Sequence, residues 1–157
     1  MPMIIVSPSF EHDGAITGRH ACDGTNISPA LNWTGVPDGT KSLALVVDDP
    51  DAPNPDAPRM TWVHWVLYNM PPGTNGLPEA ASAEMLPPET LQGLNDWQRT
   101  DYQGPCPPIG NHRYFFKLYA LSKVLSDMRR PSGKALEKTM QGYIIARSQL
   151  VGRYQRQ

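Results

Sequence analysis

The sequence lacks an excess of charge of either sign and has no long hydrophobic run. Its 14 Lys and Arg residues face 15 Asp and Glu residues, so no global field draws it to nucleic acid or to an anionic membrane. No run approaches the ~18 apolar residues of a membrane span, and no basic, apolar signal segment opens the chain. We therefore expect no nucleic-acid partner, no membrane span and a cytoplasmic location, although a mature secreted form would have the same sequence. Any bound anion must be held locally.

Cysteine is scarce, with only Cys22 and Cys106. They form no Cys-x-x-Cys motif, and no spacing of cysteine and histidine matches a zinc site. We therefore expect no metal and no cofactor, and we expect reduced thiols in a cytoplasmic chain. Internal repeats and linkers of changed composition are also lacking. A chain of 157 residues without such divisions is expected to form one domain, 1–157.

Proline is present in unusual number, with 17 copies. The prolines cluster at 50–58, 71–72, 87–88 and 105–108. Because proline breaks helices and is excluded from central strands, we expect short elements joined by many loops.

Three segments have the pattern of strands. Residues 43–47 form a continuous apolar run that ends at the acidic, proline-rich stretch 48–58, as expected for a buried strand that leads into a loop. Residues 62–68 are apolar on both faces, which predicts a central strand, and 112–121 alternates in the same way. Alternation would place four side chains on one face of the second strand: Trp62, His64, Val66 and Tyr68.

The C-terminal part predicts one helix and one further strand. Ser132 can cap a short helix that carries Leu136 and Met140 and ends near Gly142, and 144–154 could form a last strand. Strands and turns outweigh helix, so we predict a mostly antiparallel β fold with one or two peripheral helices.

Polar side chains gather where these strands begin or end. Asp49 and Asp51 follow the first strand, His64 lies on the second beside Trp62, and His112 opens the third. A scaffold that holds strand ends together while loops surround them is a common way to build a pocket. Structural roles explain the same residues: a turn for the Asp-Pro-Asp segment, a hydrogen-bonded core position for His64, and a loop-bracing ion pair between Asp51 and Arg113. The patterns alone therefore leave function open.

Four ordered motifs resemble one known family. They are Asp49 to Pro53 (DPDAP), Trp62 to Val66 (WVHWV), Gly104 to Pro108 (GPCPP) and Gly110 to Tyr114 (GNHRY). In order and spacing they are similar to the signature of the phosphatidylethanolamine-binding proteins, also called Raf kinase inhibitor proteins. Two further features resemble the short bacterial branch of that family: Cys22 to Pro29 (CDGTNISP) with Trp33, and Leu118 to Leu121 (LYAL).

The resemblance implies a large central antiparallel sheet packed on a smaller one, with a small pocket near the surface. It implies that four residues line this pocket: Asp49, His64, His112 and Tyr114. Pro53, Trp62 and Pro108 would form its wall, and the Cys106 thiol would face the cavity. The Ala52–Pro53 bond is expected to be cis, and the bond before Thr61 is a second candidate. Tyr143 stands where bacterial relatives often have histidine, so no role is carried over to it.

These side chains suit a small anion or a phosphorylated head group. Two imidazoles that become cationic near neutral pH and one phenol can donate charge-assisted hydrogen bonds to phosphate oxygens, so affinity should rise as the pH falls through ~6.5. Asp49 could orient a histidine, raise its pKa, or accept from a protonated oxygen or an amine. We therefore expect a non-catalytic binding protein that is a possible regulator or inhibitor of a partner kinase or protease.

The alternative is an unrecognised hydrolase or isomerase that uses the same four side chains, with a thiol nucleophile. No Gly-x-Ser-x-Gly elbow or phosphate loop supports it. Two expectations concern association. Cys22 and Cys106 could approach each other, because both flank motifs near the pocket mouth. The resemblance to short bacterial relatives also predicts a homodimer that is held by exposed apolar residues of the proline-rich loops.

Overall fold

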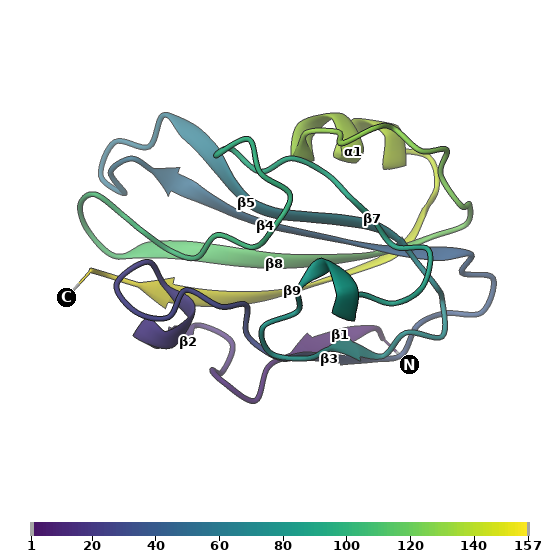
Figure 1. Ribbon diagram of the computed structural model, residues 1–157, viewed down its shortest axis with the longest axis horizontal. Coiled ribbons are helices and arrows are strands. Elements are labelled where there is room, and N and C mark those ends of the chain that lie inside the picture. Colours follow the sequence, from purple (N-terminus) through teal and green to yellow (C-terminus); the bar gives the residue numbers. More distant parts are fainter. Residues whose placement is uncertain (1, 157) are drawn as a thin grey trace.

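Two β-sheets make up most of the computed structural model, which describes residues 2–156 (Figure 1). The large sheet has the strand order β2-β9-β8-β4-β5-β7, and the small sheet has the order β1-β3-β6. The strands are β1 (Ile4–Val6), β2 (Gly14–Ala15), β3 (Leu31–Thr34), β4 (Ser42–Ala52), β5 (Met60–Met70), β6 (Gly76–Leu77), β7 (Leu91–Gln92), β8 (His112–Leu121) and β9 (Ile144–Tyr154). The helices are α1 (Gly133–Met140) and two single-turn 3-10 helices, η1 (Gly18–His20) and η2 (Ala83–Met85). The predicted mostly β, two-sheet fold is confirmed.

The main core lies between the two sheets. Figure 1 shows β1 and β3 lying beside β9 and the large sheet, and the backbone N–H of Ile5 donates to Ser148 Oγ of β9 at 3.3 Å. Trp33 of the small sheet and Leu45, Trp65 and Phe116 of the large sheet are almost completely buried there. Burying such side chains contributes roughly 1.5–3 kcal/mol each, so this core fixes how the sheets pack.

The second face of the large sheet is covered by α1. Leu136 and Met140 of the helix pack on Val66 and Tyr68 in a separate core cluster. The predicted cap is confirmed, because the Ser132 side chain accepts a hydrogen bond from the backbone N–H of Ala135 at 3.0 Å. Figure 1 shows the helix over β4 and β5, away from the small sheet. Among residues 2–156, no helix is long and apolar enough to cross a membrane.

The strand β4 is longer than its apolar run predicts. It continues through the acidic segment to Ala52, and it includes Pro50. Its pairing with β8 ends at Asp48, and its pairing with β5 is irregular between Asp49 and Ala52. Proline is tolerated there because an irregular strand end does not need every backbone N–H. The acidic residues therefore lie on a strand and not in a loop.

Candidate functional site

One cavity of about 340 Å³ opens where β4 ends and where β5 and β8 begin. The structure brings together in its lining all eight residues that were predicted for a site: Asp49, Pro53, Trp62, His64, Cys106, Pro108, His112 and Tyr114. Four further residues complete the lining: Ala52, Met60, Trp97 and Pro107. Trp97 belongs to none of the sequence motifs, and only its contacts identify it.

A β-bulge turns His64 toward this cavity. Val47 of β4 pairs with Trp65, but the next residue, Asp48, pairs with Val63, so His64 is the extra residue of β5. Regular alternation would have placed His64 on the same face as Val66 and Tyr68. That expectation is wrong: those two side chains pack under α1, whereas His64 lines the cavity and contacts Tyr114. Bulges redirect side chains in this way near functional sites.

His112 is held by acceptors at both ring nitrogens. Its Nδ1 lies 2.6 Å from Asp49 Oδ2, and its Nε2 lies 2.7 Å from the carbonyl oxygen of Ile109. A carbonyl oxygen only accepts, so Nε2 donates to it, and Nδ1 is engaged by the Asp49 carboxyl group. His112 then has no N–H left for a ligand. The expectation that it donates to a phosphate does not fit this geometry.

Asp49 is the acceptor at the centre of the site. Its Oδ1 accepts the backbone N–H of Asp51 at 2.7 Å, and its Oδ2 accepts from His112. Burial raises the pKa of Asp49, and these hydrogen bonds oppose the rise. Burial, followed by the charge of Asp49 and a hydrogen bond to it, raises the pKa of Tyr114. The Tyr114 hydroxyl thus remains protonated and directs its hydrogen toward the carboxylate.

His64 is neutral at neutral pH. Its Nδ1 donates to the carbonyl oxygen of Gln103 at 2.6 Å, which leaves Nε2 of the neutral ring as an acceptor. Burial lowers the pKa of His64 to about 4, against the effect of backbone carbonyl groups. The expectation of a cationic His64 near neutral pH is therefore wrong, because desolvation disfavours the charged ring.

Aromatic rings surround His64. The ring centroids of Trp97 and Tyr114 lie 5.0 and 5.2 Å from that of His64, and both rings meet it edge-on. Trp62 contacts Trp97 at 5.6 Å, also edge-on. Such contacts fix ring orientations, so the wall of the cavity is formed before any ligand binds.

The predicted ion pair between Asp51 and Arg113 is confirmed just outside the cavity. The Arg113 guanidinium donates from Nε and Nη2 to the two Asp51 carboxylate oxygens at 2.9 and 2.8 Å, and the Arg113 backbone N–H donates at 2.9 Å. These bonds lower the pKa of Asp51, with the side-chain bond as the largest cause. Asp51 therefore has the structural role that the sequence predicted.

Cys22 and Cys106 form a disulfide, with 5.3 Å between their Cα atoms. The approach of the two residues is confirmed, and the expectation of reduced thiols is wrong. Their loops are also joined by a hydrogen bond from the Cys22 backbone N–H to the Pro105 carbonyl at 3.0 Å. Cys106 thus faces the cavity as part of a disulfide and not as a thiol. In residues 2–156 no free cysteine remains and no cluster of metal-binding side chains occurs.

The expected cis bond between Ala52 and Pro53 is confirmed. The bond before Thr61 is not cis; Ala52–Pro53 is the one cis bond within the described residues. A cis bond that does not precede proline costs roughly 3–4 kcal/mol, and β5 begins at Met60 as an ordinary extended strand.

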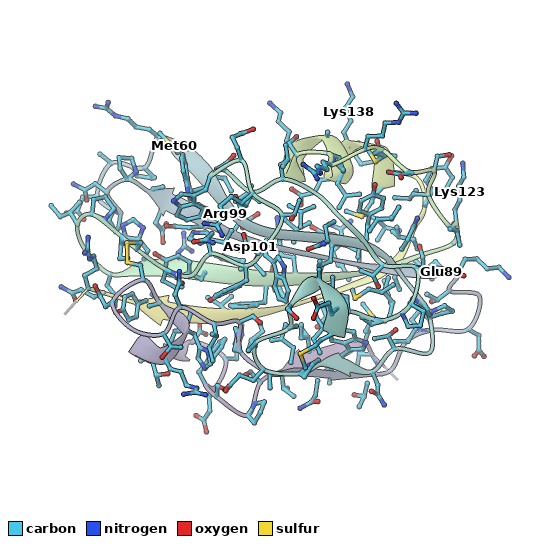
Figure 2. The ribbon with its side chains drawn as sticks, viewed as in Figure 1. Met60, Glu89, Arg99, Asp101, Lys123 and Lys138 are labelled. Carbon is cyan, nitrogen blue, oxygen red and sulfur yellow. A yellow bond between two sulfur atoms is a disulfide. The ribbon has the colours of Figure 1, made fainter. Side chains whose placement is uncertain are left out.

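The mouth of the cavity is apolar and exposed. The lining side chains of Met60 and Trp97 are 46% and 38% exposed, and Ile109, which follows the lining residue Pro108 in the chain, is 56% exposed. Figure 2 shows Met60 at the end of the molecule that also carries the disulfide. Arg99 and Asp101, labelled in the same figure, form an exposed ion pair at 2.8 Å.

Comparison with known proteins gives one consistent result. A family model described as phosphatidylethanolamine-binding protein matches residues 6–155. A relative from Methanothermobacter thermautotrophicus, described as a UPF0098 protein, is 45% identical, with 98% of this chain and 99% of the relative covered. A crystal structure of a homologue from Chlamydia trachomatis has a TM-score of 0.90 at 38% identity, covering 99% of both chains. YbcL of Escherichia coli has a TM-score of 0.90 at 32% identity, covering 100% of both chains.

Proposed function

Because the chain belongs to the phosphatidylethanolamine-binding protein family, we propose that its pocket is a non-catalytic binding site for a small anion or a phosphorylated head group. The observation that carries the proposal is the preformed cavity, in which a buried polar floor of Asp49, His112 and Tyr114 meets an aromatic wall. A concave, mostly apolar site with a few fixed polar groups is the usual form of a small-ligand pocket.

The same geometry argues against the alternative of a hydrolase or isomerase. A general base needs a free lone pair and a pKa near the working pH. Both nitrogens of His112 are engaged, and the lowered pKa of His64, about 4, makes its ring a weak base. The disulfide removes Cys106 as a thiol nucleophile. These side chains therefore support binding better than catalysis.

Titration calorimetry with inorganic phosphate and with O-phosphoethanolamine tests the proposal. We expect binding at one site per chain. The affinity should fall at least tenfold in the Trp62→Ala variant, because the substitution removes part of the aromatic wall. It should be unchanged in the Lys134→Ala variant, because Lys134 lies on the other face of the sheet. Absence of heat with both ligands would contradict the proposal. Release of phosphate from O-phosphoethanolamine during the titration would assign the hydrolase alternative.

We further propose that the exposed rim of Met60, Trp97 and Ile109 contacts a protein, either a second copy of the chain or a regulated kinase or protease. Exposed apolar side chains grouped around one cavity favour such a contact over isolated surface positions. Sedimentation of the wild type and of Ile109→Lys tests the homodimer. A mass near 17.4 kDa for the wild type at micromolar concentration would exclude it.

A further inference from the structure

The buried polar groups of the pocket use their own hydrogens within the protein. Both ring nitrogens of His112 are engaged, one by Asp49 and one by the Ile109 carbonyl. The N–H of His64 serves the Gln103 carbonyl, and the Tyr114 hydroxyl serves Asp49. The lone pairs of His64 Nε2 and of the Asp49 carboxylate remain. The floor of the pocket is thus rich in acceptors and poor in donors.

Arg113, the residue after His112 in β8, does not change this balance. Arg113 is engaged by both carboxylate oxygens of Asp51, and its side chain is 43% exposed, on the outer side of the pair. The titratable and charged groups around the floor come from three strands: Asp49 and Asp51 of β4, His64 of β5, and His112, Arg113 and Tyr114 of β8. Asp49 contacts His112 and Asp51 pairs with Arg113, so within the described residues none of these groups is a cation without a carboxyl partner.

Building on the proposed function, we propose that the pocket recognises a head group through a hydrogen that the ligand supplies, from a protonated phosphoryl oxygen or from an ammonium group. A fully ionised phosphate has only acceptors, and it would place them against the Asp49 carboxylate and the lone pair of His64. A singly protonated phosphate carries one O–H donor, and a primary ammonium carries three N–H donors. Leaving a buried acceptor without a partner weakens binding roughly tenfold to hundredfold.

A series of ligands on the wild-type protein tests this inference by calorimetry between pH 5.5 and 8. Sulfate has the shape of phosphate but carries no proton in this range, so phosphate should bind at least tenfold more tightly at pH 5.5. Inorganic phosphate keeps one O–H up to pH 8, so its advantage over sulfate should persist across this range. Methyl phosphate loses its last O–H above a second pKa of ~6, so its affinity should fall as the pH rises. Methylphosphonate, with a higher second pKa than methyl phosphate, should keep its affinity to a correspondingly higher pH, because the titrating group belongs to the ligand.

Two further ligands separate the sources of the hydrogen. O-Phosphoethanolamine keeps its ammonium N–H groups when its phosphate, with a second pKa of ~6, is fully ionised, whereas phosphocholine has no N–H. If the ammonium supplies the donor, O-phosphoethanolamine should still bind at pH 8 at least tenfold more tightly than phosphocholine. If the phosphoryl O–H supplies it, both ligands should weaken together as the pH rises.

A pair of adjacent substitutions provides a matched control. The Asp49→Asn substitution introduces an amide group that can donate a hydrogen bond. It should therefore reduce the ratio of the phosphate affinity to the sulfate affinity. Asp48, the neighbouring residue of β4, lines a hollow on the opposite face of the sheet. The Asp48→Asn substitution should therefore leave the ratio of phosphate affinity to sulfate affinity unchanged. Equal binding of sulfate and phosphate at pH 5.5, or methyl phosphate and methylphosphonate profiles that fall at the same pH, would overturn the inference and leave head-group binding intact. Absence of binding by every ligand would overturn both.

Discussion

The Asp49 carboxylate and the His112 imidazole form a buried pair that joins β4 to β8, with 2.6 Å between Oδ2 and Nδ1. The two side chains are 5% and 1% exposed. Removing one partner of a buried pair leaves the other without compensation, which costs about 3–5 kcal/mol. We therefore expect Asp49→Ala to lower the free energy of unfolding by about this amount in denaturant titrations. Asp56→Ala, exposed in the same segment, should stay within about 0.5 kcal/mol of wild type; equal losses for the two variants would refute a special role of the pair.

The Asp51–Arg113 pair should show an acid-dependent contribution to stability. Because Arg113 lowers the pKa of Asp51, the pair stabilises the fold above the unfolded pKa of ~3.9 and loses this effect as the pH falls through the lower folded value. Because solvent screens the partly exposed guanidinium, we expect Arg113→Met to lower the free energy of unfolding by only about 1 kcal/mol at pH 7. When unfolding is measured from pH 7 to 2, the free energies of unfolding of the wild type and of Arg113→Met should become equal below about pH 3. A constant difference down to pH 2 would contradict the assignment.

His64 should make the protein less stable in mild acid. Its folded pKa of about 4 lies below the unfolded value of ~6.5, so the unfolded chain gains a proton before the folded one does. Stability that is fully present above pH 6.5 is lost as the pH falls to 4, by about 3 kcal/mol. In His64→Gln, whose amide can still donate to the Gln103 carbonyl, this loss should disappear. An unchanged pH profile in the variant would show that His64 titrates normally.

Asp48, on the opposite face of β4, should titrate near pH 6. Burial raises its pKa to about 6, and Lys117, whose Nζ lies 2.6 Å from Asp48 Oδ2, limits the rise. We expect Lys117→Met to raise the pKa of Asp48 further, as measured by carbon-detected NMR of the carboxyl group. Lys134→Met, which changes a lysine lining the same hollow, should have a much smaller effect. Equal shifts in the two variants would contradict a specific pair.

The disulfide should contribute to stability because it joins residues that are 84 positions apart. Closing a loop of this length reduces the entropy of the unfolded chain, which raises the free energy of unfolding by roughly 4.5 kcal/mol. We expect the Cys22→Ser, Cys106→Ser double variant to lose about this much in denaturant unfolding, measured against the oxidised wild type. Mass spectrometry of the unreduced protein should detect no free thiol, and two alkylated cysteines would contradict the pairing.

Local patterns in the sequence predict much of the architecture. Alternating and continuous apolar residues are a direct consequence of strand geometry, and they locate the cores of β4, β5 and β8. Ser132 predicts the start of α1, because an N-cap needs only its neighbours in the chain. The motifs that contain Asp49, His64 and His112 also predict that these residues meet at one cavity.

The sequence by itself therefore determined the strands, the capped helix and the set of residues that gathers at the strand ends. Only the tertiary structure decided what those residues present to a ligand. The bulge that turns His64 inward depends on the register between β4 and β5, and the contact of Trp97 with His64 depends on how a distant loop packs. The burial of His64 and the two acceptors around His112 decide which nitrogens carry hydrogen. Desolvation and hydrogen bonding are properties of the folded environment, so the same histidines that suggest cationic donors in the sequence form an acceptor-rich floor in the fold.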